Sequence, residues 1–171
     1  MTKLVMRSMT AQDIESLHAA FAMQEWERDK SLFERYYREQ QEGSRHVVIA
    51  ECNQQLAGYA TIMKEPENGP FRGSGYPEIA DFNVFINYQR KGIGNQIMEQ
   101  CEAIVSRFSD VVTLGVGMHP GYGPAQRLYV KRGYIPDGSG LWYQEKLLPV
   151  NAPCINDDSL VLYLSKQLLP E

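Results

Sequence analysis

The feature that most restricts the fold of this chain is an apolar run, a short glycine-containing loop and a long amphipathic segment in direct succession. Residues 79–86 are apolar with little alternation, which is typical of a strand buried on both faces. Residues 92–108 repeat apolar side chains at helical spacing, on a stripe made of Ile93, Ile97, Cys101, Ile104, Val105 and Phe108. Residues 111–116 follow as another buried strand. This order predicts an α/β fold with a strand–helix–strand crossover.

The loop between the predicted strand and helix has the chemistry of an anion site. Amides at the start of a helix have no acceptor within the helix, and the helix dipole adds partial positive charge there. Gly92 and Gly94 let a ligand approach the backbone closely, and Arg90 and Lys91 add formal positive charge. The segment therefore predicts a cradle for a pyrophosphate group.

Phosphate-binding sequence patterns can be compared with this loop. The pattern G-x-x-x-x-G-K-[ST] fails, because no Lys-Ser or Lys-Thr follows the glycines. The dinucleotide pattern G-x-G-x-x-G fails at Gly115-Val116-Gly117, where the sixth position is Pro120. The pattern Q/R-x-x-G-x-G/A, which is the pyrophosphate loop of the GNAT N-acetyltransferases, is matched in full by Gln89, Gly92 and Gly94.

Two further segments extend the resemblance to the GNAT family. Residues 125–134 read A-Q-R-L-Y-V-K-R-G-Y, which is similar to the family's A-x-x-L-Y-x-x-x-G-F, and residues 58–60 resemble its third strand. The element order matches over roughly residues 3–165. One position departs from the family pattern, because Tyr122 stands where many members carry a cofactor-holding Asn.

The resemblance implies a single domain over residues 1–171 with the GNAT fold, a mixed twisted sheet with helices on both faces. It implies direct acetyl transfer from acetyl-CoA to an amine in a ternary complex, with no metal. Backbone amides of residues 82–84 would polarise the thioester carbonyl and hold the pantetheine chain. The implied cofactor-binding residues are Phe82, Val84, Phe85, Ile86, Gln89, Arg90, Lys91, Gly92, Ile93, Gly94, Asn95 and Tyr129.

Three side chains are candidates for proton transfer. Glu78, eleven residues before Gln89, matches the position of the general base in some members of the family. Asp81 competes for this role, because a carboxylate on an apolar strand is costly unless it is paired or functional. Tyr129 matches the family tyrosine that protonates the leaving thiolate; a tyrosine packed in the core is the alternative.

Composition limits the partners of the protein. A formal charge of −4 argues against general binding to nucleic acid, and no apolar stretch approaches the length that spans a bilayer. Three separated cysteines, the absence of a signal-peptide pattern and the absence of C-x-x-C and H-E-x-x-H lead us to expect a cytoplasmic protein with no metal. The expected partner is a small-molecule amine, and a homodimer is possible. The alternatives are a non-catalytic CoA-binding module, an acetyltransferase for protein or peptide amines, and a Rossmann-type nucleotide domain.

The rest of the chain predicts a first strand at residues 3–9 and helices at 11–23 and 31–42, the second ended by Gly43. A β-hairpin is expected from 47–52 and 56–62, and a loop that forms one wall of a site is one interpretation of residues 64–76. A short helix is expected to start at Pro124 and to end before Gly133. Strands at 141–147 and 160–165 are the last predicted elements of the chain.

Overall fold

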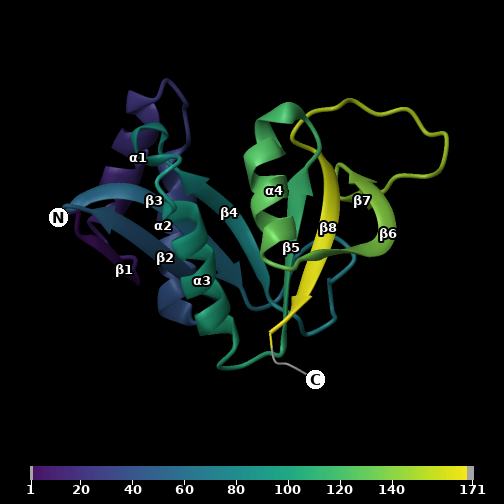
Figure 1. Ribbon diagram of the computed structural model, residues 1–171, viewed down its shortest axis with the longest axis horizontal. Coiled ribbons are helices and arrows are strands. Elements are labelled where there is room, and N and C mark those ends of the chain that lie inside the picture. Colours follow the sequence, from purple (N-terminus) through teal and green to yellow (C-terminus); the bar gives the residue numbers. More distant parts are fainter. Residues whose placement is uncertain (1, 169–171) are drawn as a thin grey trace. The chain divides into compact units, whose positions relative to one another are not determined.

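The computed structural model describes residues 2–168 and has a mixed α/β fold (Figure 1). The helices are α1 Asp13–Met23, α2 Lys30–Glu42, α3 Ile93–Val105 and α4 Gly123–Lys131, with 3₁₀ turns η1 Ile86–Tyr88 and η2 Pro120–Tyr122. The strands are β1 Leu4–Ser8, β2 Arg45–Cys52, β3 Gln55–Met63, β4 Glu78–Val84, β5 Val111–Gly117, β6 Ile135–Tyr143, β7 Lys146–Leu147 and β8 Leu160–Gln167. Their hydrogen-bonded order is β1-β2-β3-β4-β5-β8-β6-β7. The α/β class and the mixed sheet are confirmed.

The described chain divides into two compact units. Unit 1 contains the residues up to Met63 together with Ala80–Ile104, and unit 2 contains Lys64–Ile79 together with the residues from Val105 onward. The single domain predicted over residues 1–171 stays a prediction, and Met1 and residues 169–171 lie outside the described residues.

The hairpin of unit 1 is built on a two-residue turn. β2 and β3 pair antiparallel, and Asn53 and Gln54 between them have φ angles of 52° and 67°. Positive φ at both central residues is the conformation that suits the twist of a two-residue hairpin. The predicted hairpin is therefore confirmed, with Gln55 already part of β3.

Helices cover both faces of the sheet in unit 1. Leu17 and Phe21 from α1 and Phe33 from α2 pack with Ile49 and Tyr59 in one buried cluster. Neighbouring residues of a strand point to opposite faces. Gly58 therefore faces away from this cluster, and a Cβ there would lie 3.2 Å from Ile97 Cδ1 of α3. The α3 stripe thus packs on the face opposite α1 and α2.

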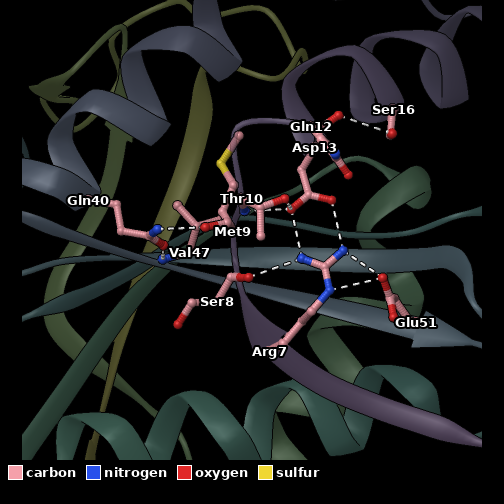
Figure 2. Close-up of polar contacts among 10 residues, drawn as sticks. All are labelled: Arg7, Ser8, Met9, Thr10, Gln12, Asp13, Ser16, Gln40, Val47 and Glu51. Carbon is pink, nitrogen blue, oxygen red and sulfur yellow. Dashed lines mark hydrogen bonds and ion pairs between the residues drawn. The ribbon is translucent and has the colours of Figure 1, made fainter.

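Arg7 of β1 connects the edge of this sheet to α1 (Figure 2). Its guanidinium donates to both carboxylate oxygens of Asp13, at 2.7 and 2.8 Å, and to Glu51 of β2 at 2.6 and 2.9 Å. The Thr10 amide also donates to Asp13. Burial alone would raise the pKa of Asp13, but the hydrogen bonds from Arg7 and Thr10 together lower it. An ionised Asp13 therefore fixes the start of α1.

Unit 2 contains the parallel end of the predicted crossover. Glu78 and Ile79 of β4 pair parallel with Thr113 and Leu114 of β5, and β5 pairs antiparallel with β8. The chain between these two parallel strands includes α3, as predicted. α4 connects to β5 through Gln126, whose side-chain amide donates to Gly117 O at 2.8 Å.

Three local predictions are wrong. The strand predicted at residues 141–147 is two antiparallel strands, because Gln144 and Glu145 turn the chain with φ angles of 49° and 65°. The strand predicted to end at Ile86 ends at Val84, and Ile86 is 63% exposed. The helix predicted to reach Phe108 ends at Val105, which leaves Phe108 exposed.

Within residues 2–168, no helix is both long enough and apolar enough to cross a membrane.

Candidate active site

The predicted pyrophosphate loop lies between η1 and α3 in unit 1. Arg90 and Gly92 have positive φ angles of 62° and 77°, and α3 begins directly afterwards at Ile93. A Cβ built at Gly92 would meet no described atom within 4 Å, so the space next to its backbone is open. Arg90 and Lys91 are exposed. The segment has the backbone freedom, the helix start and the positive charge that an anion site requires.

Side chains from the loop itself hold its shape. The Gln89 side-chain amide donates to Val84 O at 3.0 Å, which connects the loop to the end of β4. Lys91 Nζ donates to Asn87 O at 2.9 Å and lies 5.6 Å from the centre of the Tyr88 ring. Gln89 is therefore engaged in shaping the loop.

The turn before the loop is held by two residues that sequence reasoning missed. Gln24, at the end of α1, accepts a hydrogen bond from the Ile86 amide at 2.6 Å. The Tyr88 hydroxyl donates to Gln55 Oε1, at the start of β3, at 2.8 Å. Both partners lie more than 30 residues away in the sequence, so no local pattern could have indicated them.

The predicted cofactor segment of β4 continues into this turn. Phe82 and Val84 are half-buried in the strand, and Phe85 is 5% exposed. The Phe85 amide donates to Ala57 O at 2.9 Å. The Ile86 amide likewise donates to Gln24. The amides of Phe85 and Ile86 are therefore hydrogen-bonded within the protein, where they stabilise its fold.

Asp81 is surrounded by hydrogen-bond donors within unit 1. Its Oδ1 accepts from Arg28 Nη1 at 2.7 Å and from Asn83 Nδ2 at 2.9 Å. Its Oδ2 accepts from the Tyr36 and Tyr59 hydroxyls at 2.8 and 2.6 Å. Burial and the Asp81 charge raise the pKa of both tyrosines, so they remain donors. All four acceptor positions of the carboxylate are occupied.

This network also holds a bend in the strand. Asp81 has a φ of 52°, a left-handed conformation that Asp tolerates better than most residues. The Arg28 guanidinium that pairs with Asp81 lies 5.0 Å from the centre of the Phe21 ring. The loop between α1 and α2 is thereby connected to the middle of β4, directly before Phe82.

Glu78 and Tyr129 belong to unit 2. Glu78 is half-buried at the start of β4, opposite Thr113 of β5. Tyr129, in α4, is 6% exposed and its ring lies 5.9 Å from that of Tyr134. The neighbouring Leu128 is the less buried of the two. Tyr129 therefore occupies the inward position of its helix.

Tyr122, which replaces the usual family Asn, has a structural explanation in unit 2. Its ring lies against the end of β5, where a Cβ at Gly117 would collide with it. Its hydroxyl donates to Asp158 Oδ1 at 3.0 Å, and His119 Nε2 lies 2.8 Å from the same oxygen. These two hydrogen bonds lower the pKa of Asp158. Tyr122 thus attaches the segment before β8 to the turn before α4.

The predicted site residues therefore fall in two groups. Asp81, Phe82 and residues 84–95 form one stretch of unit 1, and Glu78 and Tyr129 lie in unit 2. Among the described residues, no group of three or more His, Cys, Asp and Glu side chains is placed to hold a metal ion.

The family model for the acetyltransferase (GNAT) family matches residues 11–134. This chain belongs to the GNAT acetyltransferase family. The resemblance predicted from residues 89–94 and 125–134 is confirmed, and with it the enzyme class, an acyltransferase. No curated protein matches the sequence.

Solved structures show the same fold. The ribosomal-protein-S18-alanine N-acetyltransferase from Escherichia coli is 13% identical, with a TM-score of 0.71 over 99% of this chain and 96% of that one. The spermidine/spermine N-acetyltransferase SpeG from Vibrio cholerae, in mutant forms, is 16% identical, with a TM-score of 0.67 over 97% and 95%. YncA from Salmonella typhimurium, in a structure with its cofactor acetyl-CoA, is 17% identical, with a TM-score of 0.71 over 99% and 96%.

Proposed function

We propose that this GNAT enzyme transfers the acetyl group of acetyl-CoA to the primary amine of a small molecule. The observation that carries the proposal is the loop at residues 89–94, where two positive φ angles, an open glycine and the start of α3 coincide. YncA, of the same fold, binds acetyl-CoA, which supports this cofactor. The related structures include enzymes named for a protein acceptor and for small polyamines.

The residues of the loop would hold the pyrophosphate of the cofactor. Amides at the start of α3 and the positive charges of Arg90 and Lys91 provide the attraction, and Gly92 provides the space. Acetyl-CoA supplies the activated thioester. This role leaves Gln89 to shape the loop through its hydrogen bond to Val84.

For the chemical step we assign proton transfer to Glu78 and Tyr129. Glu78 accepts a proton from the incoming ammonium, and the neutral nitrogen then attacks the thioester carbon. The C–N bond forms, the C–S bond breaks, and the leaving thiolate takes the phenol proton of Tyr129. The second proton that the nitrogen loses as it becomes an amide passes through solvent and restores the phenol. Asp81 is the weaker candidate base, because its carboxylate already accepts four hydrogen bonds.

The acetyl-CoA site can be tested by ligand-dependent thermal stability. A ligand present at 100 times its Kd stabilises the folded state by about 2.7 kcal/mol, so acetyl-CoA should raise Tm. Gly92→Val should abolish this rise, because the valine side chain fills the space that the cofactor needs.

Gly43→Val is the matched control. Gly43 has a φ of 84°, close to that of Gly92, and a Cβ there also meets no described atom within 4 Å. Both variants should therefore lose similar stability through backbone strain. Only Gly43→Val should keep the rise with acetyl-CoA, and an equal rise in a folded Gly92→Val protein would exclude this loop as the pyrophosphate site.

The cytoplasmic location and the homodimer expected from the sequence remain predictions.

A further inference from the structure

A cavity of about 400 Å³ opens over β6 and β8 in unit 2. These two strands pair antiparallel, and their neighbouring ribbons are visible in Figure 1. Its walls include the aromatic rings of Trp142 and Tyr163, which meet edge to face with ring centres 5.8 Å apart. Glu145 and Asp158 also line it, and its seven described lining residues include no Lys or Arg. It contains none of the residues assigned above to acetyl-CoA.

Tyr163 contributes a hydroxyl group to this cavity. The residue is only 8% exposed, and it lines the cavity. A Cβ at Gly69 would lie 2.8 Å from this hydroxyl oxygen, so the loop at residues 64–76 packs against the ring. A phenol hydroxyl at a cavity wall can accept a hydrogen bond from a bound ligand.

The same loop is attached to one of the cavity's carboxylates. Asn68 Nδ2 donates to Glu145 Oε1 at 3.0 Å. The Asp158 carboxylate is kept ionised by its contacts with His119 and Tyr122. The turn after β6 and the segment before β8 thus place negative charge around two aromatic rings, a combination that suits an organic cation.

The predicted base lies on the same face of the sheet as this cavity. Burial first, and then the charges of Glu78 and Glu145, raise the pKa of Tyr163 to about 12. The phenol therefore remains protonated at neutral pH. Glu78 pairs with Thr113 of β5, and Thr113 pairs with Ser165 of β8. Ser165 and Tyr163 are two residues apart on β8, so Glu78 and Tyr163 lie on the same face of the sheet.

We infer that this cavity binds the acceptor, and that the acceptor is a short aliphatic amine carrying a second positive charge. The reacting nitrogen lies toward Glu78, and the second ammonium lies against the aromatic walls with Glu145 and Asp158 as its counter-charges. The Tyr163 hydroxyl accepts a hydrogen bond from an ammonium group. This inference rests on the proposed function, because Glu78 is assigned there to the reacting amine.

The test is calorimetric titration of the intact protein, without acetyl-CoA, with 1,4-diaminobutane and with 1-aminobutane. The diamine should bind at least about tenfold more tightly than 1-aminobutane. Only the diamine carries one positive charge for Glu78 and a second for Glu145 and Asp158. Glu145→Gln should reduce this preference to about threefold or less. Glu65→Gln is the control, because Glu65 is an exposed carboxylate of unit 2, on the loop at residues 64–76, and does not line the cavity.

Tyr163→Phe keeps the ring and removes the hydroxyl, and it should weaken binding of the diamine several-fold. Equal affinities for the two amines, or an unchanged preference in Glu145→Gln, would overturn the inference. Acetylation of both amines with acetyl-CoA is measured separately. If that reaction proceeds and no preference for the diamine is found, the proposed function stands and the substrate class is wrong; selective diamine binding without any acetylation would instead remove the proposed function.

Discussion

Replacing Asp81 by Asn should reduce stability far more than catalysis. The amide keeps the size of the carboxylate, and its oxygen can still accept from Arg28 and Asn83. Its NH₂ group can donate to the Tyr36 and Tyr59 hydroxyls once these rotate. What disappears is the negative charge opposite Arg28.

The size of the loss follows from the burial of this pair. The side chains of Arg28 and Asp81 are only 20% and 15% exposed, so water compensates poorly for a lost partner. A hydrogen bond to a charged group contributes about 1.5–3 kcal/mol, and breaking a fully buried pair costs about 3–5 kcal/mol. We expect a loss of about 2–3 kcal/mol, which lowers Tm by about 5–10 °C for a chain of this size.

The assay measures Tm and kcat on the same preparations of Asp81→Asn and Glu78→Gln. Rates are taken well below the unfolding transition, with saturating acetyl-CoA. Asp81→Asn should lose stability and keep kcat within about tenfold. Glu78→Gln should lose about 10²-fold or more in kcat, as removal of a general base does, with a smaller change in Tm. The reasoning is refuted if Asp81→Asn retains its Tm and loses turnover, because Asp81 would then be the base.

Two further predictions concern α4 and α1. Tyr129→Phe keeps the buried ring of α4 and removes the proposed proton donor. Steady-state kinetics should therefore show a fall of about 10²-fold in kcat with a nearly unchanged KM for acetyl-CoA. An unchanged kcat together with a lowered Tm would make Tyr129 a core residue only. The pKa of Asp13 is lowered in the folded state, so its contribution to stability is present above the unfolded pKa of about 3.9 and is lost as pH falls through the lower folded value. Urea unfolding should therefore show Asp13→Asn about 1–3 kcal/mol less stable than wild type at pH 7, with a gap that narrows below about pH 4, and a gap independent of pH would contradict the Arg7–Asp13 account.

The sequence predicts the centre of the fold because several local signals agree there. In residues 89–105 a glycine pattern, two basic residues and an apolar helical stripe all indicate the same loop and helix, and Gly92 indeed has a positive φ. The wrong predictions fall where such signals are missing. Gln144 and Glu145 turn the chain without Gly, Asn or Asp, the residues usually found at such φ angles.

The surroundings of the candidate site depend on contacts that are distant in the sequence. Asp81 meets Arg28 and Tyr36 across 53 and 45 residues, so the sequence suggests only that a carboxylate on this strand needs a partner or a function. Trp142 and Tyr163 become cavity walls only through the pairing of β6 with β8. Such clusters form through tertiary packing, and the local periodicity of the sequence does not reveal which distant residues will meet.

The most direct test of the central claim is acetyl transfer itself. The purified protein is incubated with acetyl-CoA and increasing 1,4-diaminobutane or 1-aminobutane, while released thiol is recorded and the amine product is identified by mass spectrometry. An amine-dependent rate of thiol release, with one N-acetylated amine formed per thiol released, is the predicted result. Thiol release that does not depend on the amine, or release without an acetylated product, would contradict the assignment of this chain as an amine N-acetyltransferase.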